Sequence, residues 1–148
     1  MAFQFSLAGV LRYRQSQEER ERLALQRLHT RRAALLRELH EIREASLQLQ
    51  RSLRRHLQQA LIPAVAVQVC GDMTNRLERR QQQLRAALLQ LQSEVAVQTE
   101  RYKQARQKRE VLDSLCERQL NEYRRHQQRR EQAAVDELFL LRRNLWRA

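Results

Sequence analysis

Residues that break helices are almost absent from this chain of 148 residues. Glycine occurs only at positions 9 and 71, and proline occurs only at position 63. A multilayered globular core needs turns about every ten to fifteen residues, and this chain has no turn residues to build them. What remains is dominated by Leu, Gln, Arg, Glu and Ala, a composition typical of long helices in a coiled coil. We therefore expect one all-α, coiled-coil domain over residues 1–148.

Cysteine is equally scarce, with single residues at positions 70 and 116. On one continuous helix these would lie roughly 70 Å apart, because a helix rises about 1.5 Å per residue. A disulfide requires Cα atoms within about 7 Å, so we expect no intramolecular disulfide. Two isolated thiols favour a reducing, cytoplasmic environment.

Long apolar runs are missing too. The charge-free stretch Leu61 to Gly71 is too short to cross a bilayer. Residues 1–5 lack the basic region and the long apolar region of a signal peptide. The sequence therefore predicts a cytoplasmic protein with no direct membrane span.

Arginine is abundant and evenly spread, and the net charge is +12. Residues 1–60 hold 12 Arg and 6 Glu, and residues 72–148 hold 17 Arg or Lys and 11 Asp or Glu, so each part carries +6. Two alternative explanations fit this charge: the arginines are the solvated flanks of a coiled coil, or they bind an acidic surface on a partner. Arginine pairs could grip phosphates, but no aromatic stacking platform or recognition module accompanies them. We expect no specific nucleic-acid partner.

Catalytic and ligand-binding motifs are absent. Both glycines are isolated, which excludes a phosphate-binding glycine loop. His40 and Glu44 share one helix face and would supply half of a metal site, with no further ligand nearby in the sequence. Acidic pairs such as Glu41 and Glu44 lie on a convex helix face rather than in a cleft. We expect no enzyme activity, no cofactor and no metal.

Apolar residues recur at alternating spacings of three and four, the pattern of a coiled-coil seam. The first helix is predicted over about 6–60, a connector over about 61–72 around Pro63 and Gly71, and the second helix over about 73–146. A short link favours an antiparallel two-helix hairpin. The polar segment 15–22 weakens the seam, and there the hairpin would splay or meet another chain. The predicted seam residues are Leu25, Leu28, Leu35, Leu39, Leu53, Leu88, Leu91, Val95, Tyr102, Leu112 and Cys116.

Symmetry about the connector predicts which residues face each other. The numbers of facing residues should add up to about 134, which sets Leu39 against Val95, Leu11 against Tyr123, and Phe3 near Glu131. Beyond that point the second helix has no partner and protrudes by roughly 25 Å. Its apolar stripe predicts a binding element, with a frayed or back-folded terminus as the alternative.

Three stretches resemble the flagellar FliJ family, and together they cover nearly the whole chain. The first is Phe3-x-Phe5-x-Leu7-x-x-Val10-Leu11-x-x-Arg14-x-x-x-Glu18. The second runs from Lys108-Arg109-Glu110-Val111-Leu112 to Glu122-Tyr123-Arg124-Arg125, and the third is Glu131-Gln132-x-x-x-Asp136-Glu137-Leu138.

The resemblance implies a soluble stalk of the flagellar type III export apparatus, which supports flagellar assembly and motility. Such proteins insert the end bearing both termini into the hexameric export ATPase and promote its assembly. Their other end faces the membrane export gate, and some members handle export chaperones. Alternatives are the equivalent stalk of a virulence injectisome and a generic structural or nucleic-acid-associated coiled coil.

Carried onto this sequence, the resemblance assigns two contact regions. The expected contacts with the ATPase ring are Phe3, Phe5, Arg129, Arg130, Leu138, Leu141, Arg142, Arg143, Leu145 and Trp146. The expected contacts with the export gate are Ile42, Leu49, Met73, Leu77, Arg80 and Leu84. Ile42, Leu49, Leu77 and Leu84 also fit the seam, which is the competing explanation for those positions.

Overall fold

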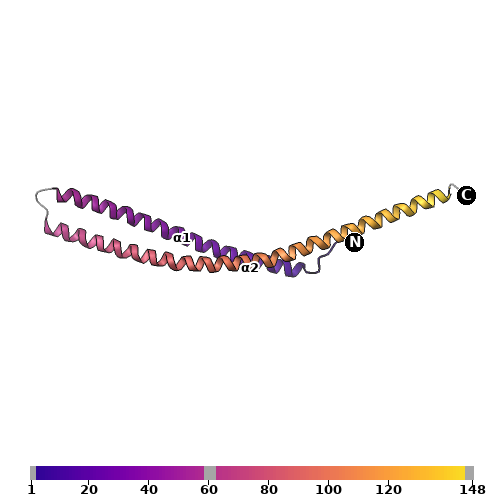
Figure 1. Cartoon of the computed structure of the whole chain (residues 1–148), viewed down its shortest axis with the longest axis horizontal. Helices are drawn as coiled ribbons and strands as arrows, with labels where there is room; N and C mark the ends of the chain where they lie inside the picture. The colour runs from indigo at the N-terminus through magenta and orange to yellow at the C-terminus, as the bar shows by residue number, and fades with distance from the viewer. Residues whose placement is uncertain (1–2, 59–62, 146–148) are drawn as a thin grey trace. The chain divides into compact units, whose positions relative to one another are not determined.

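Two long helices make up nearly all of the described chain. The computed structural model describes residues 3–58 and 63–145. Helix α1 spans Ala8–Leu57 and helix α2 spans Ala64–Leu145, and the described residues contain no strand. The two helices pack against each other (Figure 1), which confirms the prediction of an all-α helical hairpin.

The chain reverses direction earlier than the sequence predicts. Gly71 and Asp72 were assigned to the connector by their chemistry, but both lie inside α2. Pro63 directly precedes this helix, where its missing N–H costs nothing, and its carbonyl accepts a hydrogen bond from the Ala66 amide at 2.9 Å. Gly71 has no positive φ angle. One interior glycine costs about 1 kcal/mol, which is too little to end a long helix.

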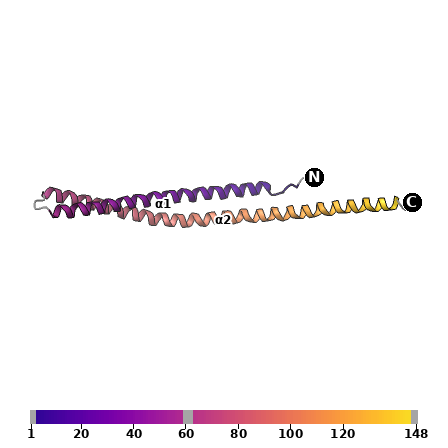
Figure 2. The same cartoon turned by 90° about the horizontal axis from the view of Figure 1, so that it is seen from above.

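The chain divides into two compact units, and each is described by itself. The hairpin unit is Arg20–Tyr102, and the terminal unit combines Met1–Glu19 with Lys103–Ala148. In the hairpin unit α1 and α2 lie side by side in both views (Figure 2). In the terminal unit the start of α1 runs along the second half of α2. The two helix segments are antiparallel in each unit.

The register of the helices follows from the contacts across each unit. In the hairpin unit Arg80 pairs with Glu38 at 2.5 Å and Arg31 pairs with Glu94 at 4.0 Å. In the terminal unit the rings of Phe3 and Tyr123 lie 5.7 Å apart, centroid to centroid. These residue numbers add up to 118, 125 and 126. The predicted value of 134 is therefore wrong, because the chain turns before Ala64 rather than near residue 67.

The core is small and lies between the two helices of the hairpin unit. Leu39, Leu84 and Leu91 are its buried apolar side chains, with 6%, 2% and 2% exposed. Gln98 is the buried polar side chain beside them. Leucines at this spacing lie along one stripe of each helix. Two helices can bury these stripes only when the stripes face each other.

Candidate protein-binding surfaces

The predicted seam residues lie where the two helices meet. Leu39 and Leu91 are buried, and the other nine predicted seam residues are half-buried. Cys116 is one of these nine, and both it and Cys70 carry free thiols. Burial of this kind leaves the seam residues little surface with which to contact another molecule.

The polar segment 15–22 does not leave the helices unpaired. In the hairpin unit the amide of Gln98 donates hydrogen bonds to the Glu21 carbonyl oxygen at 3.1 Å and to Glu21 Oε2 at 2.5 Å. In the terminal unit Arg109 Nε donates to Glu18 Oε2 at 2.5 Å. The expected splaying at this segment is wrong, because carboxylates on α1 meet complementary donors on α2.

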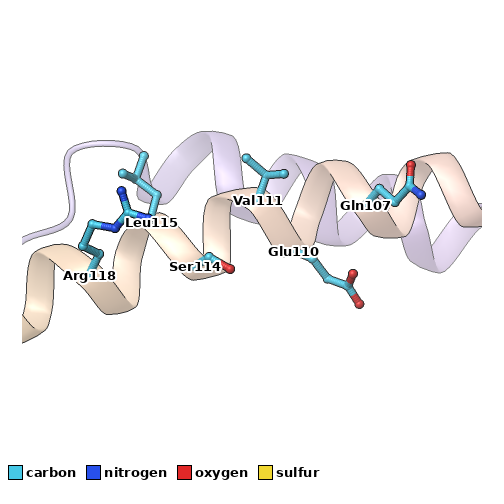
Figure 3. A pocket seen from close by; sticks show the side chains of 6 residues that line it. All are labelled: Gln107, Glu110, Val111, Ser114, Leu115 and Arg118. Atoms are coloured by element: carbon cyan, nitrogen blue, oxygen red, sulfur yellow. The ribbon is translucent and has the colours of Figure 1, made fainter.

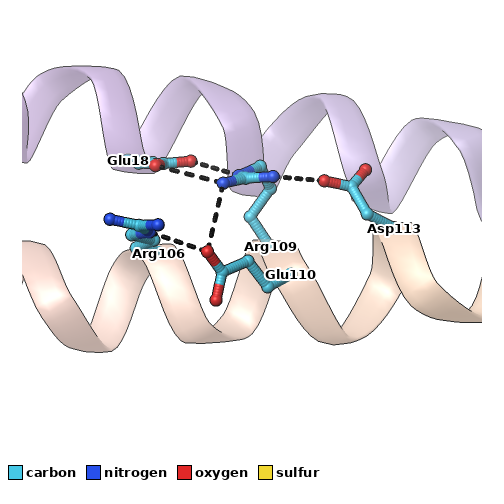
Figure 4. Close-up of polar contacts among 5 residues, drawn as sticks. All are labelled: Glu18, Arg106, Arg109, Glu110 and Asp113. Atoms are coloured by element: carbon cyan, nitrogen blue, oxygen red, sulfur yellow. Dashed lines mark hydrogen bonds and ion pairs between the residues drawn. The ribbon is translucent and has the colours of Figure 1, made fainter.

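Arg109 is the centre of a charged cluster in the terminal unit (Figure 4). Its guanidinium lies between Glu18 of α1 and Asp113 of α2, and it also contacts Glu110 at 3.7 Å. Arg106 holds the same Glu110 carboxylate at 2.7 Å. Hydrogen bonds from Arg109 to Glu18, and then to Asp113, raise the pKa of Arg109 above its usual value. The arginine therefore stays charged and fixes one register of the two helices.

A shallow groove of about 610 Å³ runs along α2 next to this cluster (Figure 3). Its lining is Gln107, Glu110, Val111, Ser114, Leu115 and Arg118. None of these six is a histidine or a cysteine, and the one carboxylate is already held by two arginines. The groove is an open strip on a helix surface, unlike the enclosed clefts in which small molecules bind.

The residues expected to contact the ATPase ring belong to the terminal unit. Phe3 packs on Tyr123 and is half-buried, as is Phe5. After Gln127 every residue of α2 through Arg143 is exposed, and we call residues 128–143 the C-terminal overhang. It carries the expected residues Arg129, Arg130, Leu138, Leu141, Arg142 and Arg143. Leu145 ends α2, and Trp146 lies outside the described residues.

The overhang is strongly apolar for an exposed helix. Leu138 and Leu141 are 67% and 60% exposed. Val135, Phe139 and Leu140 are also exposed. Val135 is not among the residues expected from the sequence, although its position three residues before Leu138 places both on one helix face. Large exposed apolar patches are typical of surfaces that bind another protein.

The residues expected to contact the export gate separate into two groups. Leu49, Met73 and Leu77 line a second groove of about 500 Å³ in the hairpin unit, together with Ala45, Gln48, Ser52 and Arg76. Leu84 is buried between the helices, Ile42 is half-buried, and Arg80 is held by Glu38. The first group therefore offers surface to a partner, whereas Leu84 does not.

Comparison with known protein families identifies the family to which the chain belongs. The family model described as the flagellar FliJ protein matches residues 3–145. The chain belongs to the FliJ family. It is a flagellar export protein, as the resemblance implied. No curated protein and no solved structure matches the chain.

Two further observations belong beside the FliJ assignment. Neither described helix contains a segment both long and apolar enough to cross a membrane. The described residues also contain no group of three or more His, Cys, Asp or Glu side chains arranged to hold a metal ion. The exposed surfaces of this FliJ family member include the two grooves described above and the C-terminal overhang.

Proposed function

We propose that this FliJ-family chain is the stalk of the flagellar export apparatus, with its C-terminal overhang bound in the hexameric export ATPase. The observation that carries the proposal is the exposure of every described residue of α2 from Gln128 to Arg143. A helix that continues past its partner while remaining apolar needs a binding surface elsewhere.

Charge adds a second element to this surface. Arg129 and Arg130 stand before the apolar residues of the overhang, and Arg142 and Arg143 stand after them. An acidic lining in the ATPase ring would complement both arginine pairs, and it would steer the overhang into place. Leu138 and Leu141 would then supply the buried apolar contact at the centre.

In the hairpin unit the stalk contacts the export gate through the groove lined by Leu49, Met73 and Leu77. This groove is apolar, and Arg76 at its margin supplies a positive charge. Leu84 is left out of this contact because it is buried between the helices. A Met73→Ser, Leu77→Ser variant should bind the cytoplasmic part of the gate more weakly while ATPase stimulation stays unchanged.

The deciding experiment is ATP hydrolysis by the cognate export ATPase, with and without this chain, across the concentrations at which the ring forms. We expect stimulation that saturates at about one copy per hexamer. A Leu138→Ser, Leu141→Ser variant should lose the stimulation. The matched control is Leu36→Ser, Leu47→Ser, which removes two exposed leucines from α1.

Either of two results would contradict the ATPase contact. One is stimulation that survives in the Leu138→Ser, Leu141→Ser variant. The other is the absence of stimulation and binding with a folded sample of the full chain. The second result would favour a generic coiled coil with another partner.

A further inference from the structure

The apolar stripe of the C-terminal overhang repeats with the spacing of a coiled-coil seam. Gln127, the last half-buried residue of α2 among those described, is followed by Ala134 and Leu141 at intervals of seven residues. Leu138 lies four residues after Ala134 and three before Leu141. Leu145, the last residue of α2, is the next position of the repeat. A second helix with the same spacing can cover a stripe of this kind.

Within the described residues, no helix of the same chain covers this stripe. Ala134, Leu138 and Leu141 are all exposed. The overhang is already helical in the single chain, so it can pair with another helix without the cost of starting a new one. The helix that covers the stripe must therefore come from another molecule.

Charged residues of opposite sign flank the stripe on its two sides. Glu137 directly precedes Leu138 on one side. Arg142 directly follows Leu141 on the other side. Both charged residues are exposed, and neither forms an ion pair with any other described residue. One seam thus carries an acidic edge and a basic edge.

A second copy of the overhang complements the first when the two are parallel. In a parallel pair of helices, the edge positions that face each other across the seam are five residues apart in number. Glu137 of one copy then meets Arg142 of the other, and the two-fold symmetry of the pair forms this ion pair twice. An antiparallel pair would instead set Arg142 against Val135, where no opposite charges meet.

Glu131 limits the length of the paired segment. It lies seven residues before Leu138, so pairing that continued to this position would bring two carboxylates together in the seam. The segment from Ala134 to Leu145 has four seam positions. A seam of this length is far smaller than the interface of a permanent dimer, so we expect a weak and reversible pair.

We propose that two copies of this chain pair in parallel through their C-terminal overhangs, with Leu138 and Leu141 buried in the shared seam. Each copy then covers the exposed stripe of the other. Because Leu138 and Leu141 are also assigned to the ATPase ring, the pair must separate before one copy enters the ring, and this consequence rests on the proposed function. The pairing itself does not rest on it.

The test is the molar mass of the full chain, measured by sedimentation equilibrium over a series of concentrations and without ATPase. We expect the mass to rise from one copy toward two. A Leu138→Ser, Leu141→Ser variant should pair at least about tenfold more weakly, because each half of the seam loses two apolar side chains.

The matched control for this variant is Phe139→Ser, Leu140→Ser. Phe139 and Leu140 are 67% and 53% exposed, but they lie outside the stripe. The control should keep the affinity of the parent chain. Circular dichroism would verify that both serine variants remain helical.

Charge reversal tests the orientation of the pair. Glu137→Arg should pair about fivefold more weakly than the parent chain, because like charges then meet at both edges of the seam. Arg142→Glu should lose affinity to the same degree for the same reason. An equimolar mixture of the two variants should regain the affinity of the parent chain, because each edge again joins an arginine to a glutamate.

Oxidative cross-linking tests the orientation independently, in a chain with Cys70→Ser and Cys116→Ser. Ala134→Cys should give disulfide-linked pairs, because parallel pairing brings the two introduced thiols together across the seam. Antiparallel pairing of the same leucines would hold these thiols roughly 16 Å apart along the helix. Ala133→Cys is the control, because this neighbouring position lies outside the stripe.

Three results would overturn the proposal. They are a single-copy mass at every concentration, equal losses for the two serine variants, and a mixture of the charge variants that stays unpaired. ATPase stimulation by the same samples separates this proposal from the proposed function. Stimulation by a chain that never pairs would overturn the pairing alone. Pairing by a chain that does not stimulate the ATPase would support the pairing and contradict the ATPase contact.

Discussion

The hairpin unit and the terminal unit are made from the same two helices, but different chemistry holds each of them together. The buried side chains among the described residues are Leu39, Leu84, Leu91 and Gln98, and all four belong to the hairpin unit. In the terminal unit the ring of Phe3 packs against that of Tyr123, and Arg109 joins two carboxylates.

This difference has a consequence for how each unit responds to change. Burial of leucine is non-directional and contributes roughly 1.5–3 kcal/mol per side chain, so it stabilises the hairpin strongly without selecting one register. Ion pairs on half-exposed side chains contribute little stability, but they require particular partners. We infer that the hairpin unit supplies most of the stability and that the polar contacts select the alignment.

The largest effect is expected from Leu39→Asp. Loss of a buried leucine side chain costs about 2–5 kcal/mol, and placing a carboxylate among apolar side chains adds to this cost. The variant should lose helicity and melt at a much lower temperature by circular dichroism. Leu36→Asp is the matched control, because Leu36 is 46% exposed on the same helix. Equal melting of the two variants would show that Leu39 does not support the hairpin.

A smaller change is expected from Gln98→Leu, and it should affect alignment more than stability. The side chain loses its hydrogen bonds to Glu21, each of which contributes about 1 kcal/mol, but it gains apolar burial. A single polar residue in an apolar seam is known to fix register at some cost in stability. We therefore expect an unfolding free energy within about 1 kcal/mol of the parent chain, with an additional slipped register.

Cross-linking measures this register directly in a chain with Cys70→Ser and Cys116→Ser. Glu38→Cys with Arg80→Cys reports the native alignment, because these side chains form an ion pair at 2.5 Å. Glu38→Cys with Met73→Cys reports a slip of one heptad. Gln98→Leu should raise the yield of the second pair, and an unchanged yield would mean that the leucines alone set the register.

The sequence was sufficient to predict the helices and their seam, because both depend on periodic spacing. The connector was misplaced because Gly71 and Asp72 have the chemistry of a turn, and Pro63 alone was enough to start α2. The register error followed from that misplacement. The pairing of Glu18 with Arg109 was also missed, because these residues are 91 positions apart and no local pattern links them.

Some residues of the candidate surfaces could likewise be predicted from the sequence, and others could not. Leu138 and Leu141 were predictable as exposed residues, because the second helix is longer than the first. Leu84 and Met73 share an apolar character in the sequence, yet one is buried and the other is exposed. Their difference follows the seam spacing, because Leu84 lies seven residues before the buried Leu91 and Met73 lies outside this repeat.

The smallest effect is expected from added salt, and it should distinguish the terminal unit from the hairpin unit. Added NaCl screens exposed and half-exposed ion pairs but leaves apolar burial intact. Amide hydrogen exchange in residues 10–18 should therefore quicken about two- to fivefold with salt, whereas exchange around Leu39 should quicken less, because leucine burial there adds to the Glu38–Arg80 ion pair. Because its partners raise the pKa of Arg109, its contribution is complete at neutral pH. This contribution decreases as the pH rises far enough to titrate the arginine. Arg109→Gln should abolish the salt response, and a response that persists in this variant would mean that other contacts hold the terminal unit together.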